Sequence, residues 1–239
     1  MYFSLFLLAP LLAVASGFMN STIAKPIHLN TQNVLLLRGE ITEKLATQFV
    51  YELNQKTNKK NIYVFLDTNG GSVDAGNKIV GEIQKYSLDC IAHKAISMGF
   101  VILQSCRNRY ITPLGTLMQH QISYGVSDEK AKVESYADFI KQIGDYLNGM
   151  QADKIGIAHD EMQRRTYNDW WLFGNNAVKA NCVDEIASVT CSSKLTNQTY
   201  SIEKGSFDYI YSKCPLVTGP VDKKKNKNQN SLEDYLSFL

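Results

Sequence analysis

The sequence has almost no excess charge: 25 lysines and arginines oppose 23 aspartates and glutamates, a net charge of +2 over 239 residues. This balance gives no reason to expect a nucleic acid or an anionic surface as a partner. The one basic run, 223–227, is short and lies in a polar segment, so we interpret it as solvated. No cysteine pair and no cysteine–histidine pair has the spacing of zinc ligands, and we expect no metal site. There is also no internal repeat.

The first residues are apolar and lack any lysine or arginine before Lys25. The run 1–15 is short for a transmembrane helix, and its end, Ala13-Val14-Ala15, fits a small-x-small cleavage site. We therefore predict a signal peptide over 1–17 and a secreted or lumenal protein, in the secretory pathway or the periplasm. Because the usual basic residues are missing, a second interpretation stays open, in which 3–19 is a membrane anchor.

Two Asn-x-Ser/Thr triplets agree with export and make Asn20 and Asn197 candidate glycosylation sites. The cysteines number five, so at least one thiol stays unpaired within the chain. Cys191 and Cys214 flank a loop-like insert and are the candidate disulfide in an oxidising compartment.

Apolar periodicity divides the chain into alternating strands and helices as far as residue 186. The predicted strands are 34–37, 62–66, 90–93, 109–112 and 116–120, the last two around a turn at 113–115. The predicted helices are 41–53, 71–83, 98–106, 133–150 and 176–180. This alternation favours one α/β domain, 25–190, with a largely parallel sheet. From about residue 188 the pattern gives way to Ser, Asn, Lys and Tyr, so 191–239 is predicted as an appended, irregular and partly disordered tail.

Ser97 lies between a predicted strand and a predicted helix, where the free N–H groups of a helix start favour negative charge. A serine nucleophile needs a neutral histidine such as His120, which in turn needs a carboxylate such as Asp169 to fix its tautomer. An oxyanion needs backbone amides, and Gly70-Gly71 lets the main chain approach closely. Spacing alone does not select these roles. Ser97 also fits a helix cap, His120 a buried strand residue, Asp169 a helix start and the glycines a tight turn.

The motifs around these residues resemble those of the proteolytic subunit of the Clp protease, the ClpP family, which has the crotonase-like fold. Four of them occur in the family's order between about residues 34 and 186, where the family has N-S-P-G-G-x-x-x-A-G, A-A-S-M-G, M-I-H-Q and D-T-x-R-D-x-F. Here they are Asp67-Thr-Asn-Gly-Gly-Ser-Val73 with Ala75-Gly76, Ala95-Ile-Ser-Met-Gly99, Met118-Gln-His-Gln121 and Arg165-Thr-Tyr-Asn-Asp-Trp170.

This resemblance implies a layered fold of repeated β-α units with a protruding long helix. It implies peptide-bond hydrolysis through an acyl-enzyme by a serine endopeptidase, without a cofactor. Carried over by position, Ser97 is the nucleophile, His120 the base and Asp169 the orienting carboxylate. The N–H groups of Gly71 and Met98 form the oxyanion hole. Peptides or unfolded proteins are the implied substrates, and a homo-oligomeric ring is the implied assembly.

Three residues depart from the family's motifs: Asn69 and Ile122 replace prolines, and Asn168 replaces an arginine. The family's N-terminal gating segment has no obvious counterpart, and an exported protein meets no ATP-driven unfoldase, so we doubt an ATPase partner. Two alternatives stay open. One is a signal-peptide-peptidase-like protease with a Ser–Lys dyad, in which Lys141 is the base. The other is a non-catalytic assembly module.

Overall fold

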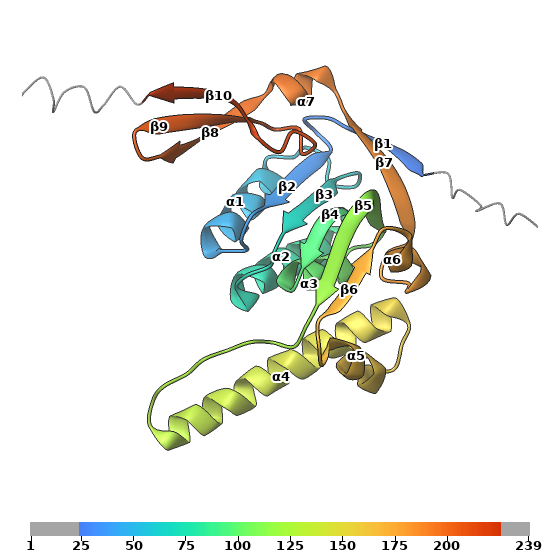
Figure 1. Cartoon of the computed structure of the whole chain (residues 1–239), viewed down its shortest axis with the longest axis vertical. Coiled ribbons are helices and arrows are strands. Elements are labelled where there is room, and N and C mark those ends of the chain that lie inside the picture. Colours follow the sequence, from blue (N-terminus) through green and yellow to red (C-terminus); the bar gives the residue numbers. More distant parts are fainter. Residues whose placement is uncertain (1–23, 226–239) are drawn as a thin grey trace, which may run out of the picture.

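The computed structural model describes residues 24–225. The predicted signal peptide, the alternative anchor 3–19 and Asn20 lie outside this range. The centre of the molecule is a seven-stranded sheet with the order β1-β7-β5-β4-β3-β2 and with β6 paired to β5 (Figure 1). Its strands are β1 (Lys25–Leu29), β2 (Val34–Arg38), β3 (Tyr63–Thr68), β4 (Asp89–Ile96), β5 (Arg109–Gln119), β6 (Trp170–Phe173) and β7 (Glu185–Cys191). Every pair is parallel except β5–β6. The predicted α/β fold with a largely parallel sheet is confirmed.

The larger core lies on the face of the sheet that α1 (Glu43–Asn54), α2 (Val73–Tyr86) and α3 (Met98–Gln104) cover. Parallel strands need crossover connections, and these helices supply them. α1 and α2 each begin after a capping residue, because the side chains of Thr42 and Ser72 accept hydrogen bonds from backbone N–H groups three residues on.

The opposite face of the sheet carries a smaller core. Successive side chains of a strand point to opposite faces, so Val64 and Leu66 join the helix-covered core while Phe65 lies on the other side. Leu195 of α7 (Ser193–Asn197) and Cys214 pack into this second core. The segment after β7 therefore covers part of the sheet.

Residues 193–225 differ from the predicted irregular tail. After α7 they form β8 (Thr199–Lys204), β9 (Phe207–Ser212) and β10 (Pro220–Lys225), an antiparallel sheet with the order β10-β9-β8. Aromatic and β-branched residues alternate with polar ones over 199–212, and Gly205, with a φ of 59°, forms the turn between β8 and β9. The polar composition concealed these strands because they bury few side chains.

The structure corrects the sequence prediction at β5 as well. This strand continues through 113–115, where a turn was predicted. Its register with β4 passes from Ala92↔Ile111 to Lys94↔Thr116, so the extra residues of β5 form a bulge. The pattern also missed β1, β6 and α5 (His159–Thr166).

The long helix α4 (Lys130–Ile155) lies at the opposite end of the molecule from β8–β10 (Figure 1). Its buried residues all lie from Leu147 onward, so its first half extends away from the core. A short α6 (Asn175–Lys179) follows β6. Within residues 24–225, no helix combines the length and the apolar character needed to cross a membrane.

Candidate active site

Three neighbouring parallel strands bring the predicted site segments together at their carboxyl ends. β3 leads into Gly70-Gly71, β4 into Ser97 and β5 into His120. The N–H of Ser97 donates to the carbonyl of Met118 at 2.8 Å, which holds the end of β4 against β5. Open parallel sheets bind ligands at this edge.

Ser97 has a strained backbone, with φ 56° and ψ −119° immediately before α3. Its side chain makes no capping bond to α3. Its Oγ instead lies 2.8 Å from Nε2 of His120. When Nε2 is unprotonated, the hydroxyl donates to it, which is the contact that a general base requires. The helix-cap interpretation of Ser97 therefore does not hold.

Gly70 and Gly71 place backbone next to Ser97. A Cβ on Gly70 would lie 2.7 Å from the carbonyl oxygen of Ile96 and 2.8 Å from Cβ of Ser97, so only glycine permits this approach. An isolated β-bridge joins Gly71 to Ile41. In it, the N–H of Ile41 donates to the carbonyl of Gly70, and the N–H of Ser72 donates to the carbonyl of Ile41. Within residues 24–225, the backbone N–H groups of Gly71 and Met98 have no hydrogen-bond acceptor. These donors are the ones predicted for the oxyanion hole.

A cavity of about 200 Å³ collects four predicted site residues: Gly71, Ser97, Met98 and His120 all line it. Its walls include apolar side chains, which exclude water and strengthen the electrostatic interactions inside. They are Val73, Val101, Ile122 and Leu147.

Asp169 does not join this cluster. Its side chain is exposed, and no hydrogen bond to His120 is formed. Asp169 nevertheless immediately precedes β6, which pairs with the strand that leads into His120. The register of β6 with β5 is Met118↔Trp171 and Gln119↔Trp170. The ladder ends at this pair, and continuing it by one step would place His120 opposite Asp169. Directly opposed residues of antiparallel strands have Cβ atoms about 4.5–5.5 Å apart, so one further step of the ladder brings this carboxylate beside the imidazole.

Lys141 does not have the environment of a catalytic base. It lies on α4 with 74% of its side chain exposed, and its Nζ is 2.9 Å from Oδ2 of Asp145. This hydrogen bond raises the pKa of Lys141, which keeps the amine protonated at neutral pH. The lysine does not line the Ser97 cavity. The geometry thus does not favour the Ser–Lys alternative.

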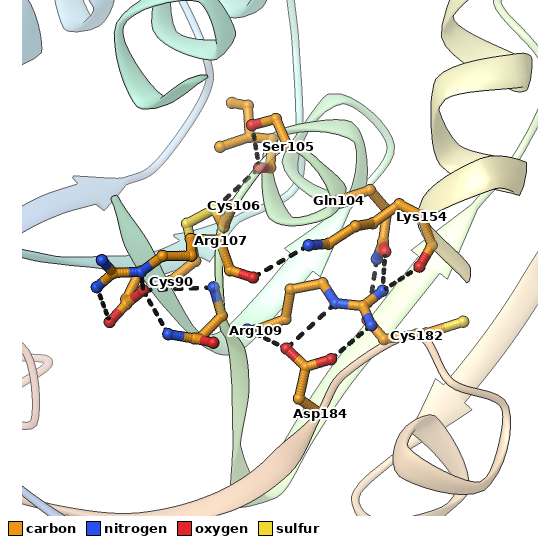
Figure 2. The surroundings of a disulfide bond; sticks show 12 residues. Cys90, Gln104, Ser105, Cys106, Arg107, Arg109, Lys154, Cys182 and Asp184 are labelled. Carbon is orange, nitrogen blue, oxygen red and sulfur yellow. Dashed lines mark hydrogen bonds and ion pairs between the residues drawn. A yellow bond between two sulfur atoms is a disulfide. The ribbon is translucent and has the colours of Figure 1, made fainter. Parts of the chain in front are cut away.

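Sequence reasoning missed a disulfide that encloses the Ser97 segment. Cys90, at the start of β4, is joined to Cys106, just after α3, across a sequence separation of 16 (Figure 2). The signal was available, because the two cysteines bracket the strand–turn–helix unit that carries Ser97. A second disulfide joins Cys191 to Cys214, the pair singled out in the sequence.

Hydrogen bonds of the buried Arg109 connect the strand–turn–helix unit that carries Ser97 to α4 and to the residue before β7 (Figure 2). Its guanidinium lies 2.6 Å from Asp184 and 2.7 Å from Oε1 of Gln104 in α3, and it also donates to the carbonyl of Lys154 in α4. Burial raises the pKa of Asp184, but the hydrogen bonds from Arg109 outweigh it, and the net pKa lies below the ordinary value of 3.8. Burial raises the pKa of the free Cys182 thiol to about 12, so this cysteine is no nucleophile.

One other predicted site residue lies in the described part of the chain. Asn197 ends α7 with an exposed side chain. Across the part of the chain described, 24–225, no group of three or more His, Cys, Asp or Glu residues is arranged to hold a metal ion.

A strained serine within reach of an imidazole, beside two unpartnered amides, is the arrangement of a serine hydrolase. Comparison with known proteins agrees. A family model described as Clp protease matches residues 20–190. The ATP-dependent Clp protease proteolytic subunit 2 of Prochlorococcus marinus (strain MIT 9312) is 27% identical over 167 residues, which cover 66% of this chain and 82% of that protein. The chain belongs to the Clp protease family, and it is a serine-type endopeptidase.

Proposed function

We propose that this protein cleaves peptide bonds through an acyl-enzyme formed on Ser97. The observation that carries the proposal is the 2.8 Å separation between Ser97 Oγ and His120 Nε2. As Oγ attacks the carbonyl carbon, its proton passes to Nε2 and then to the leaving amine. A water molecule activated by the same nitrogen releases the acyl group. The N–H groups of Gly71 and Met98 stabilise the oxyanion.

Asp169 is assigned the role of the orienting carboxylate. Its place opposite His120 in the extended β5–β6 ladder supports this role. Extending that ladder by one pair, together with rotation of the carboxylate, fixes the imidazole tautomer and stabilises the imidazolium. In this proposal, Asp169 engages His120 only when the site is in its active form.

The setting of the enzyme is part of the proposal. Two disulfides within one chain support an oxidising compartment, and thus export directed by 1–17 with glycosylation at Asn20 and Asn197. In such a compartment the substrates are peptides or unfolded proteins, cleaved without an ATPase partner. Exposed aromatic residues on α4 support assembly into a homo-oligomeric ring: Tyr136, Phe139 and Tyr146.

A fluorophosphonate probe tests the chemistry, and native mass spectrometry of the same sample reports the assembly. The probe should label the wild-type protein and the matched control Ser105→Ala, whose hydroxyl donates to the carbonyl of Ile102 at the other end of α3. Labelling should vanish in Ser97→Ala. Turnover should fall by about 10⁴-fold or more in His120→Ala, and by about 10²- to 10⁴-fold in Asp169→Asn.

Two results decide against the proposal. Labelling that survives in Ser97→Ala contradicts the assignment of the nucleophile. An assembled ring that takes up no probe and cleaves no unstructured peptide identifies the non-catalytic assembly module instead.

A further inference from the structure

A cavity of about 640 Å³ lies between α1 and the segment that follows β7. It forms where residues 20–190, which the Clp protease model matches, meet the appended residues 191–225. No residue that lines the Ser97 cavity also lines this one. The cavity is therefore separate from the candidate active site and depends on a segment outside the family match.

Three of the four charged residues that line this cavity are lysines, and the fourth is Glu52. The lysines are Lys56, Lys194 and Lys213. Within residues 24–225, none of the three forms an ion pair with a carboxylate, whereas other lysines, such as Lys141, do. The cavity thus has an excess of positive charge that Glu52 offsets only in part.

The backbone next to the two appended lysines is anchored in the protein. Lys194, on α7, immediately precedes the buried Leu195. Lys213 immediately precedes the buried Cys214, which is disulfide-bonded. Positively charged groups that the fold already holds in place lose less conformational entropy when a ligand binds.

The third lysine, Lys56, is half-buried just after α1, and its ammonium group donates to the carbonyl of Thr31 at 2.8 Å. Burial lowers the pKa of Lys56 below the ordinary value of 10.5; Glu52 opposes this shift, and the positive charge of Lys213 adds to it. Two ammonium groups from distant parts of the chain thus repel each other at one cavity, and a bound anion would relieve that repulsion.

We infer that this cavity binds a sugar that carries a phosphate or sulfate group. The ammonium groups hold the oxygens of that group through charge-assisted hydrogen bonds. The volume is many times the roughly 30 Å³ of one water molecule, so the rest of the ligand also has room. Amide groups that both donate and accept face its hydroxyls, from Gln32, Gln55 and Gln198.

This inference goes beyond the proposed function and does not depend on it. Glucose 6-phosphate, titrated into the full chain at low salt and followed by isothermal titration calorimetry, provides the test. It should bind saturably with a Kd of about 1 mM or below, and glucose, which has no anionic group, should not bind. Glucose 6-sulfate in the same titration shows which of the two groups the cavity prefers. If neither ester binds at concentrations up to about 10 mM, or if glucose binds equally well, the inference is wrong.

Lys194→Gln is the most direct variant, because Lys194 is exposed and the change removes a charge without opening a core. It should raise the Kd by about tenfold, and Lys213→Gln should have a similar effect. The matched control is Lys44→Gln, at the other end of α1 and outside the cavity, which should keep the wild-type Kd. Equal weakening in Lys44→Gln and Lys194→Gln indicates attraction by overall charge alone and overturns the assignment.

Limited proteolysis gives a second measurement. Because the ligand contacts both α1 and the appended segment, glucose 6-phosphate should slow cleavage within 192–225 in the wild type and not in Lys194→Gln. Ser97→Ala should bind with the wild-type Kd, so a failure of the proposed function leaves this site intact. A wild-type protein that reacts with the fluorophosphonate probe but binds neither ester disproves the sugar site alone.

Discussion

The seven-stranded sheet buries its central strands from both faces, whereas the three-stranded sheet β8–β10 leaves most of its residues in solvent. Along β4 only His93 is exposed, while every residue of β10 is exposed. The first sheet is held by two hydrophobic cores and a buried polar network around Arg109. The second is fastened by the Cys191–Cys214 disulfide and by Arg38, which donates to the carbonyls of Pro215 and Val217. A protein can therefore carry a sheet with little core of its own, provided that covalent and polar ties fasten it.

The largest loss of stability in the seven-stranded sheet should come from Arg109→Leu. The Arg109 side chain is 3% exposed and contacts Asp184 just before β7, Gln104 of α3 and the carbonyl of Lys154 in α4. Its removal leaves Gln104 Oε1 without its donor and leaves Asp184 with the backbone N–H of residue 109 alone. We expect a loss of about 3 kcal/mol in the free energy of unfolding, measured by urea denaturation. Arg164→Leu, which breaks exposed ion pairs, should cost less than about 1 kcal/mol. Equal losses in the two variants would show that the buried network is not what holds the first sheet.

Removing the two disulfides separately should sharpen the comparison. Their sequence separations of 16 and 23 predict similar contributions of about 3 kcal/mol each. The functional results should differ. Cys90→Ala/Cys106→Ala should slow probe labelling, because this bond encloses the Ser97 segment. Cys191→Ala/Cys214→Ala should make 192–225 sensitive to limited proteolysis while the labelling rate stays near that of wild type. Slower labelling in both variants would mean that the second sheet supports the active site.

The smallest effect is expected from Lys141→Ala. Because the hydrogen bond that Lys141 donates to Asp145 keeps this lysine protonated, the labelling rate should change by less than about threefold, whereas His120→Ala should lose labelling. The opposite pattern would restore the Ser–Lys mechanism.

Local sequence pattern predicted much of the first sheet and little of the second. The apolar runs of β2 and β3 and the stripes of α1 and α2 repeat with the periods of strand and helix, because one or both faces are buried. In β8–β10 the periodicity is weak because few side chains are buried. β5 was split at Pro113 because a local pattern cannot show that a bulge lets the strand continue.

The candidate site, too, was predicted only in part from the sequence. Motif order alone singles out Ser97, His120, Asp169, Gly71 and Met98. The strained φ of Ser97 and its contact with His120 come from the meeting of three strand ends. Lys56 lies far from Lys194 and Lys213 in the chain, and no local pattern predicts that the three line one cavity.

By itself, the sequence determined the alternation of strands and helices and the residue types that a serine peptidase needs, because periodicity and side-chain chemistry are local properties. Only the tertiary structure decided that Ser97 meets His120, that Asp169 stands one ladder step away and that three lysines line one cavity. These outcomes depend on strand register and on how the segment after β7 packs, which are set by contacts between residues far apart in the chain.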